Sequence, residues 1–123
     1  MKDLFMVLRR CILVVYHDIE WRDEMFDKML NAYPEAMVCR KIKSMCGCSI
    51  ELIDGTILKF VYAGDNSRGV CADKIIAQPG IEQEVLTTIF GRALVHTTSM
   101  YVATDDGIKP AAIYYTEEAM NAK

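Results

Sequence analysis

The chain has 123 residues, of which 52% are hydrophobic and 25% charged, and its formal net charge at pH 7 is -3. This composition is ordinary for a globular protein and excludes a disordered chain, which lacks the apolar residues needed for a core. The small negative charge argues against a dedicated nucleic-acid-binding protein, because such proteins usually carry a basic surplus. Since the sequence shows no linker, repeat or low-complexity tract, we expect a single domain over residues 1–123.

The cysteines and the first residues bear on the compartment. There are five cysteines, an odd number, and Cys11 and Cys71 lie in apolar runs, as small buried residues would. A chain of this length does not need disulfides, so we expect a reducing compartment, the cytoplasm. Arg9 and Arg10 interrupt the apolar residues near the start, and we therefore expect no signal peptide, no transmembrane segment and no membrane partner.

The first part of the chain alternates between helical and strand patterns. Residues 11–16 form a continuous apolar run of strand length, which indicates a strand covered on both faces. A helix is predicted from about Asp18, a suitable N-cap, to Tyr33, because apolar residues recur at helical spacing and Pro34 would end it. The other predicted elements of this part are a short helix over residues 2–10 and a strand over residues 36–42.

The strongest local pattern is a hairpin around Asp54 and Gly55. Two strand-like runs, 49–53 and 56–62, flank this Asp-Gly pair, which favours the positive φ angles of a type I′ turn. After a polar loop, the sequence predicts further elements: a buried strand at 73–77, a helix at 81–94, a strand at 95–103, a turn at 105–107, and a tail from 111 onward that fits a strand or a helix. Helices that alternate with buried strands predict a three-layer α/β fold with a mostly parallel sheet and one antiparallel hairpin.

Three segments, in order, resemble the ATPase core of phage large terminases, the DNA-packaging motors with a P-loop NTPase fold. They are Leu13-Val14-Val15-Tyr16, the run from Ile50 to Phe60 with its Asp-Gly centre, and the run from Ser67 to Ala77 with its Arg68-Gly69 pair. The resemblance covers roughly residues 4–103. It implies the scaffold of that family: an apolar strand and a helix, then a hairpin, then a strand that ends in the Walker B acids.

The catalytic groups of that family are missing at two places. A phosphate loop of the form G-x-x-x-x-G-K-[ST] wraps the nucleotide phosphates, but none of the seven glycines is followed by lysine. Where the family carries the acid pair that holds Mg²⁺, this sequence has Gln78-Pro79. Glu82 and Glu84 follow, but first-turn glutamates are favoured by the helix dipole alone. We therefore predict no autonomous ATPase site, no catalytic residue and no cofactor.

Other reactive side chains are better explained by structure. Zinc accepts the ligand types of Cys39, Cys46 and Cys48 with His17 or His96, but the Cys-x-Cys spacing is atypical of a zinc knuckle, and we expect no metal. A nucleophile at Cys48 or His96 would need a partner close in space. Asp105-Asp106-Gly107 is typical of a turn.

Two surface features are candidates for contact with a partner. Arg40, Lys41 and Lys43 lie along a predicted strand, which indicates either an edge strand protected from aggregation by its charges or a phosphate-contacting edge assisted by Lys59 and Arg68. The helix that carries Trp21 and Arg22 has more large apolar residues than one face needs, which is also typical of a protein interface.

These observations favour a non-catalytic, phage-type protein that acts by binding another protein in the host cytoplasm. Such a pseudo-ATPase would regulate packaging or replication machinery, or inhibit a host defence nuclease such as a CRISPR effector. The alternatives are a nucleic-acid-binding module that uses the basic edge, a motor subunit that receives its phosphate loop in trans, and a decayed terminase remnant. A homo-oligomer is compatible with each of them.

Overall fold

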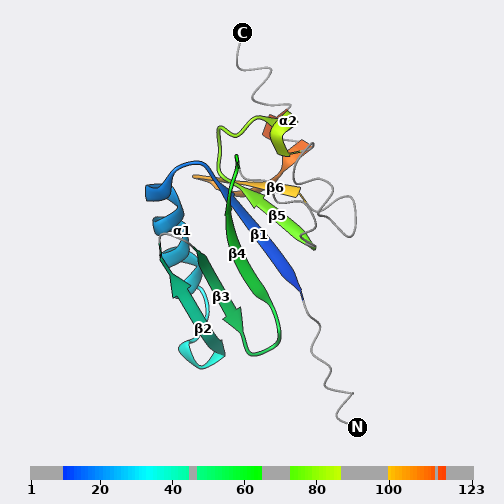
Figure 1. The fold of residues 1–123 in the computed structure, drawn as a ribbon. Helices are drawn as coiled ribbons and strands as arrows, with labels where there is room; N and C mark the ends of the chain where they lie inside the picture. Colours follow the sequence, from blue (N-terminus) through cyan, green and yellow to red (C-terminus); the bar gives the residue numbers. More distant parts are fainter. Residues whose placement is uncertain (1–9, 45–46, 65–72, 87–99, 113, 116–123) are drawn as a thin grey trace.

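The structure, a computed structural model, describes residues 10–44, 47–64, 73–86, 100–112 and 114–115, which build one seven-stranded sheet (Figure 1). The strands are β1 (Cys11–Tyr16), β2 (Val38–Lys43), β3 (Cys48–Leu52), β4 (Ile57–Tyr62), β5 (Lys74–Ala77), β6 (Met100–Thr104) and β7 (Gly107–Pro110). The helices are α1 (Ile19–Asn31), the 3-10 turn η2 (Glu35–Met37) and the short α2 (Gln83–Val85). Across the sheet the strands follow the order β2-β3-β4-β1-β5-β6-β7.

Several predicted elements are confirmed. The apolar run at 11–16 forms β1, the helix predicted after Asp18 is α1, and the turn at 105–107 joins β6 to β7. Asp18 stands at the N-cap of α1, although its side chain makes no capping hydrogen bond. The predicted helix at 2–10, most of the polar loop, most of the helix at 81–94 and the start of the strand at 95–103 lie outside the described residues.

The prediction of a three-layer, mostly parallel α/β sheet of the P-loop NTPase type is wrong. The sheet is mixed: β4, β1, β5 and β6 are parallel neighbours in its centre, whereas β2–β3, β3–β4 and β6–β7 are antiparallel. The lengths of the connections explain this, because a parallel pair needs a crossover of a dozen or more residues and these three pairs are joined by short turns. In the described part of the chain, α1 is the one long helix.

The turn between β3 and β4 also differs from the prediction. Gly55 has a φ of 94°, but no non-glycine residue in the described part has a positive φ, so Asp54 does not adopt the type I′ conformation. The Gly55 N–H donates to the Leu52 carbonyl at 3.0 Å, and the Leu52 N–H donates to the Thr56 carbonyl at 2.8 Å. This pattern is a type I turn followed by a glycine bulge. The Asp54 carboxylate stabilises it by accepting the Thr56 N–H at 2.9 Å.

The central strands are buried on both faces, as the apolar run of β1 predicted. On one face, α1 packs over β1, β3 and β4, and the rings of Phe26 and Phe60 lie 5.7 Å apart (Figure 1). On the other face, Leu13 and Ile75 form a second cluster with Ile81 and Leu86, which follow β5. Alternate residues of β1 thus belong to different clusters, so its position in the sheet is fixed from both sides. No helix in the described ranges is long and apolar enough to cross a membrane.

Candidate functional site

The carboxyl ends of the parallel neighbours β1 and β5 form a candidate binding position. The two strands are parallel neighbours, and the chain leaves β1 toward one face of the sheet through α1 and leaves β5 toward the other face through α2. Ligands of open α/β sheets bind at such a point, where the strand order reverses. His17 and Asp18 follow β1 here, and Gln78 and Pro79 follow β5.

Gln78 connects the carboxyl ends of β1 and β5 through hydrogen bonds. Its side chain is 7% exposed, and its Oε1 accepts the backbone N–H of His17 at 2.9 Å and that of Asp18 at 3.2 Å. The Gln78 backbone N–H donates to the Val15 carbonyl at 2.9 Å. Gln78 therefore joins the two strand ends and provides an acceptor to amides that precede α1. Its side-chain oxygen therefore stabilises the ends of the two strands.

Pro79 and Gly80 carry the chain away from this junction. Pro79 is half-buried, and Gly80 has a φ of +100°, a conformation that favours glycine. A Cβ on Gly80 would lie 3.5 Å from Nε2 of His17, in ordinary van der Waals contact. His17 is exposed. Among the residues that the structure describes, no group of three metal-ligating side chains gathers at the end of β5.

Arg22, one of the partner-contact candidates, lies inside the molecule. It is 3% exposed, its NH2 group is 3.0 Å from the Asp23 carboxylate, and its guanidinium stands 5.4 Å from the centre of the Tyr16 ring. Burial lowers the pKa of Arg22, but the contacts with Tyr16 and Asp23 outweigh that effect and the net change is a raised pKa. Trp21 is half-buried and packs against the cluster under α1. Both side chains help to hold α1 against the sheet.

The cysteines do not form a metal centre in the described part of the chain, where no group of three metal-ligating side chains comes together. Cys39 is exposed beside a register shift in β2, whereas Cys48 is buried at the opposite end of the β2–β3 pair. Burial raises the pKa of the Cys48 thiol against the opposing effect of Arg22, which disfavours a nucleophilic thiolate. Cys46 and His96 lie outside the described residues.

The basic strand is an edge of the sheet, as predicted. Among the described strands β2 pairs only with β3, and five of its six residues are exposed. Lys41 and Lys43 stand opposite Ile50 and Cys48, so they belong to the face that α1 covers, and Arg40 belongs to the other face. Lys43 Nζ lies 3.4 Å from the Asp27 carboxylate of α1 and 5.5 Å from the centre of the Phe26 ring.

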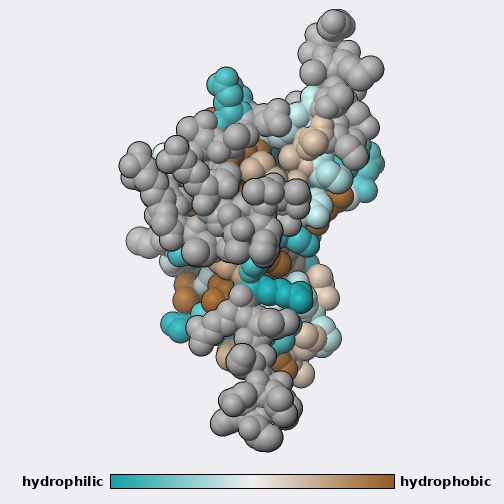
Figure 2. Space-filling view, turned by 90° about the vertical axis from the view of Figure 1, so that its right-hand side faces the viewer, coloured by the Kyte–Doolittle hydropathy of each residue, from teal (hydrophilic) through white to brown (hydrophobic). Residues whose placement is uncertain are grey.

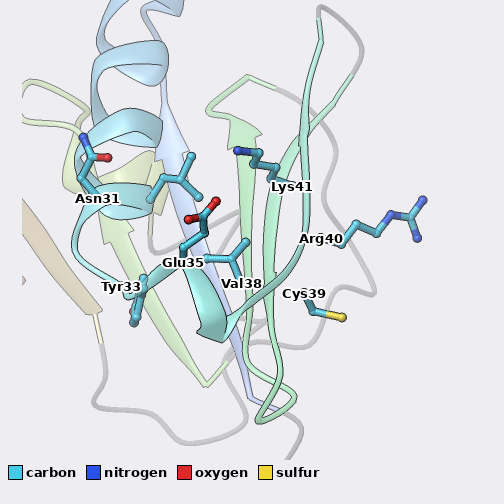
Figure 3. A pocket seen from close by; sticks show the side chains of 8 residues that line it. Asn31, Tyr33, Glu35, Val38, Cys39, Arg40 and Lys41 are labelled. Atoms are coloured by element: carbon cyan, nitrogen blue, oxygen red, sulfur yellow. The ribbon is translucent and has the colours of Figure 1, made fainter.

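A groove of about 520 Å³ lies between the edge strand and the end of α1. Figure 3 shows Lys41 pointing across it toward the helix, while Arg40 points away on the other side of β2. The residues that line the groove are Leu30, Asn31, Tyr33, Glu35, Val38, Cys39, Arg40 and Lys41. Charged groups of both signs thus stand beside partly buried apolar side chains of the cluster under α1.

The other basic candidates lie apart from the groove. Lys59 is exposed on β4, on the face opposite α1, because it stands beside Leu13 in the register. Arg40 is on that same face, but its partner on β3 is the acid Glu51, whereas the β3 partner of Lys59 is Ser49. Arg68 lies outside the described residues.

The sequence pointed to the charges of β2 but not to the groove beside them. The groove exists because Pro34 and η2 turn the chain directly from α1 into β2, and the only sequence signal was the Tyr33-Pro34 helix stop.

On the side of the molecule away from β2, hydrophobic and hydrophilic residues of the described part are interspersed (Figure 2). No family model, curated protein or solved structure significantly matches this chain.

Proposed function

We propose that the protein is a non-catalytic binding protein and that it contacts a protein partner through β2 and the adjacent groove. The observation that carries this proposal is the exposed cationic edge strand beside the groove of about 520 Å³. Peptide segments commonly bind to exposed sheet edges, where the backbone provides affinity and neighbouring pockets provide specificity. The groove residues Leu30, Val38 and Tyr33 offer the apolar part of such a contact.

Gln78 supports the non-catalytic part of the proposal. By the sequence resemblance, Gln78 stands where phosphoryl transfer in the terminase family depends on a metal-binding carboxylate. Here a neutral amide stands at that place and uses its oxygen to accept two backbone N–H groups. A motor subunit that receives its phosphate loop in trans would need Oε1 of Gln78 to give up its hydrogen bonds with the His17 and Asp18 N–H groups. That alternative is therefore weaker.

Binding of nucleic acid by the same edge is the second candidate. Arg40 and Lys59 share a face of the sheet, and phosphates favour arginine and lysine. However, Glu51 stands directly opposite Arg40 on β3, and Lys43 is paired with Asp27. A phosphate backbone laid across these strands would therefore meet a carboxylate, which favours a protein partner.

Quantitative affinity capture tests the proposal. Purified wild-type protein, the double variant Arg40→Glu/Lys41→Glu and the matched control Lys59→Glu are immobilised and exposed to extracts of phage-infected and uninfected bacteria. The terminase resemblance makes packaging proteins, replication proteins and host defence nucleases the first proteins to purify and retest. We expect direct binding of a purified partner to wild type and to Lys59→Glu, with loss in the double variant.

Two results would contradict this function. One is that no protein is retained at any salt concentration. The other is that calorimetry detects binding of ATP with Mg²⁺, which would favour the motor subunit. A salt-dependent affinity for single- or double-stranded DNA that falls in both the double variant and Lys59→Glu would favour the nucleic-acid alternative instead.

A further inference from the structure

We infer that β2 accepts an extended acidic segment of a partner protein as an additional, eighth strand of the sheet. This inference rests on the proposed function and specifies its chemistry. It depends on three observations: the direction of the β2 backbone groups, the charges along the strand, and the groove under the end of α1. Each limits the occupant in a different way.

The backbone of β2 has hydrogen-bonding groups directed away from the sheet. In the turn that follows β2, the Ser44 N–H donates to the Gly47 carbonyl at 2.8 Å, so these two residues form a hydrogen-bonded antiparallel pair. Bonded and non-bonded pairs alternate along such a ladder. By this alternation Ile42 and Arg40 bond to β3, whereas the N–H and C=O groups of Lys41 and Lys43 point to the free edge.

The charges of β2 decide which chain can pair there. Arg40, Lys41 and Lys43 are three of its six residues, and the strand has no acid. A second copy of this chain paired through the same edge would place these cations against one another, which is unfavourable in directly opposed pairs. An acidic strand would instead place carboxylates beside Lys41 on the face covered by α1 and beside Arg40 on the other face.

The groove adds a requirement for one apolar side chain. It continues the face of β2 that carries Lys41 (Figure 3), and its lining includes Leu30 and Val38 from the cluster under α1. Glu35 also lines it, so a carboxylate placed beside Glu35 would be repelled. The occupant is therefore an extended segment with acids beside the cations and an apolar residue over Leu30 and Val38.

Selection from a display library of random eight-residue peptides tests this chemistry and does not require a purified partner. The purified full chain is the target, and the strongest binders are synthesised with a fluorescent label. We expect them to be enriched in acidic residues that alternate with apolar ones. We also expect their affinity to fall about tenfold or more when their acids are replaced by amides, or when alternate backbone nitrogens are methylated.

Variants of β2 then locate the contact. Lys41→Gln removes a charge, and Lys41→Pro removes the same charge and also the outward N–H, so Lys41→Pro should bind the peptides more weakly than Lys41→Gln. The double variant Arg40→Glu/Lys41→Glu should lose the acidic peptides and gain the corresponding lysine peptides, whereas Lys59→Glu should bind as wild type does. Rescue by the reversed charges excludes simple misfolding.

The outcomes separate this inference from the proposed function. Selected peptides without an acidic excess, or with affinities that do not change in the β2 variants, would overturn the inference. If, in that case, affinity capture still yields a partner, the protein binds through another surface or another chemistry. If β2 binds DNA more tightly than any selected peptide, and the DNA affinity falls in Lys59→Glu, nucleic acid is the ligand and the inference is wrong.

Discussion

Gln78 and His17 stand at the ends of neighbouring parallel strands, and Oε1 of Gln78 accepts the backbone N–H of His17 at 2.9 Å. The same oxygen accepts the Asp18 N–H, which lies directly before α1. One buried amide thus connects β5, β1 and the start of the helix. Gln78 is therefore part of the framework at the carboxyl ends of these strands.

The first prediction concerns this amide. Gln78→Ala removes a buried acceptor and leaves two backbone donors in partly buried hydrogen bonds without their partner, so we expect the free energy of unfolding to fall by about 1–3 kcal/mol. Gln78→Glu keeps an acceptor oxygen and should lose less stability at neutral pH. Urea denaturation of both variants and of wild type measures the difference. An alanine variant as stable as wild type would show that water replaces the amide without cost.

The second prediction concerns the ion pair of α1 between the buried Arg22 and the partly exposed Asp23. The Arg22 side chain is 4% exposed and that of Asp23 is 39% exposed. Asp23→Ala leaves a buried guanidinium without its carboxylate, and we expect a loss of about 1–3 kcal/mol. Arg22→Met leaves a carboxylate that water can reach and fills the site with an apolar chain of similar length, so it should cost less.

Thermal and chemical denaturation of the two variants test this asymmetry, with Lys28→Met as a matched exposed control on the same helix. Lys28 is exposed, and surface substitutions usually change stability by no more than about 0.5 kcal/mol. Equal losses for Asp23→Ala and Arg22→Met would mean that the pair contributes through packing alone.

The strands and turns could be predicted from sequence where one local signal decides them. The apolar run of β1 and the glycine of the β3–β4 turn are two such cases, because continuous burial and positive φ both leave a local trace. The turn type could not be read from Asp54-Gly55, since the same pair fits a type I′ turn and a type I turn with a bulge. The pairing direction at the sheet edges depends on which strands meet, and that is a tertiary property.

The candidate site was predictable only in part for the same reason. A period of two places Lys41 and Lys43 on one face of a strand, and their density of charge is typical of an edge. That this face continues into a groove depends on how α1 ends near β2. The burial of Arg22 likewise depends on the Tyr16 ring beneath it, which lies on β1. Helical spacing alone made Arg22 look like a surface residue.

The third prediction concerns pH and the β3–β4 turn. The hydrogen bond from the Thr56 N–H holds the pKa of Asp54 below its ordinary value. A carboxyl group whose pKa is lower in the folded state stabilises the fold above its unfolded pKa, which is about 4 for aspartate, and this stabilisation is lost as the pH falls through the folded pKa. Wild type should therefore be more stable than Asp54→Ala at pH 7, and the difference should shrink below about pH 4.

Urea denaturation of wild type and Asp54→Ala at pH 7 and at pH 3 gives the two differences. Asp105→Ala is a suitable control, because Asp105 is exposed in the glycine-containing turn between β6 and β7. A difference between wild type and Asp54→Ala that stays constant with pH would mean that the carboxylate charge has no part in the turn.

The fourth prediction concerns the thiols of Cys39 and Cys48, and it also reports on the groove. Cys39 is exposed and lines the groove, whereas Cys48 is buried and its pKa is raised by that burial. Because the thiolate is the reactive form, iodoacetamide at pH 8 should modify Cys39 in the native protein and modify Cys48 only after addition of denaturant. Peptide mass mapping follows each cysteine separately, and Cys39→Ser controls for assignment.

A bound edge peptide should slow the modification of Cys39, since the added strand would cover the groove, whereas a ligand on the opposite face of the sheet would leave the rate unchanged. Rapid native modification of Cys48 would contradict the packing of α1 over β3.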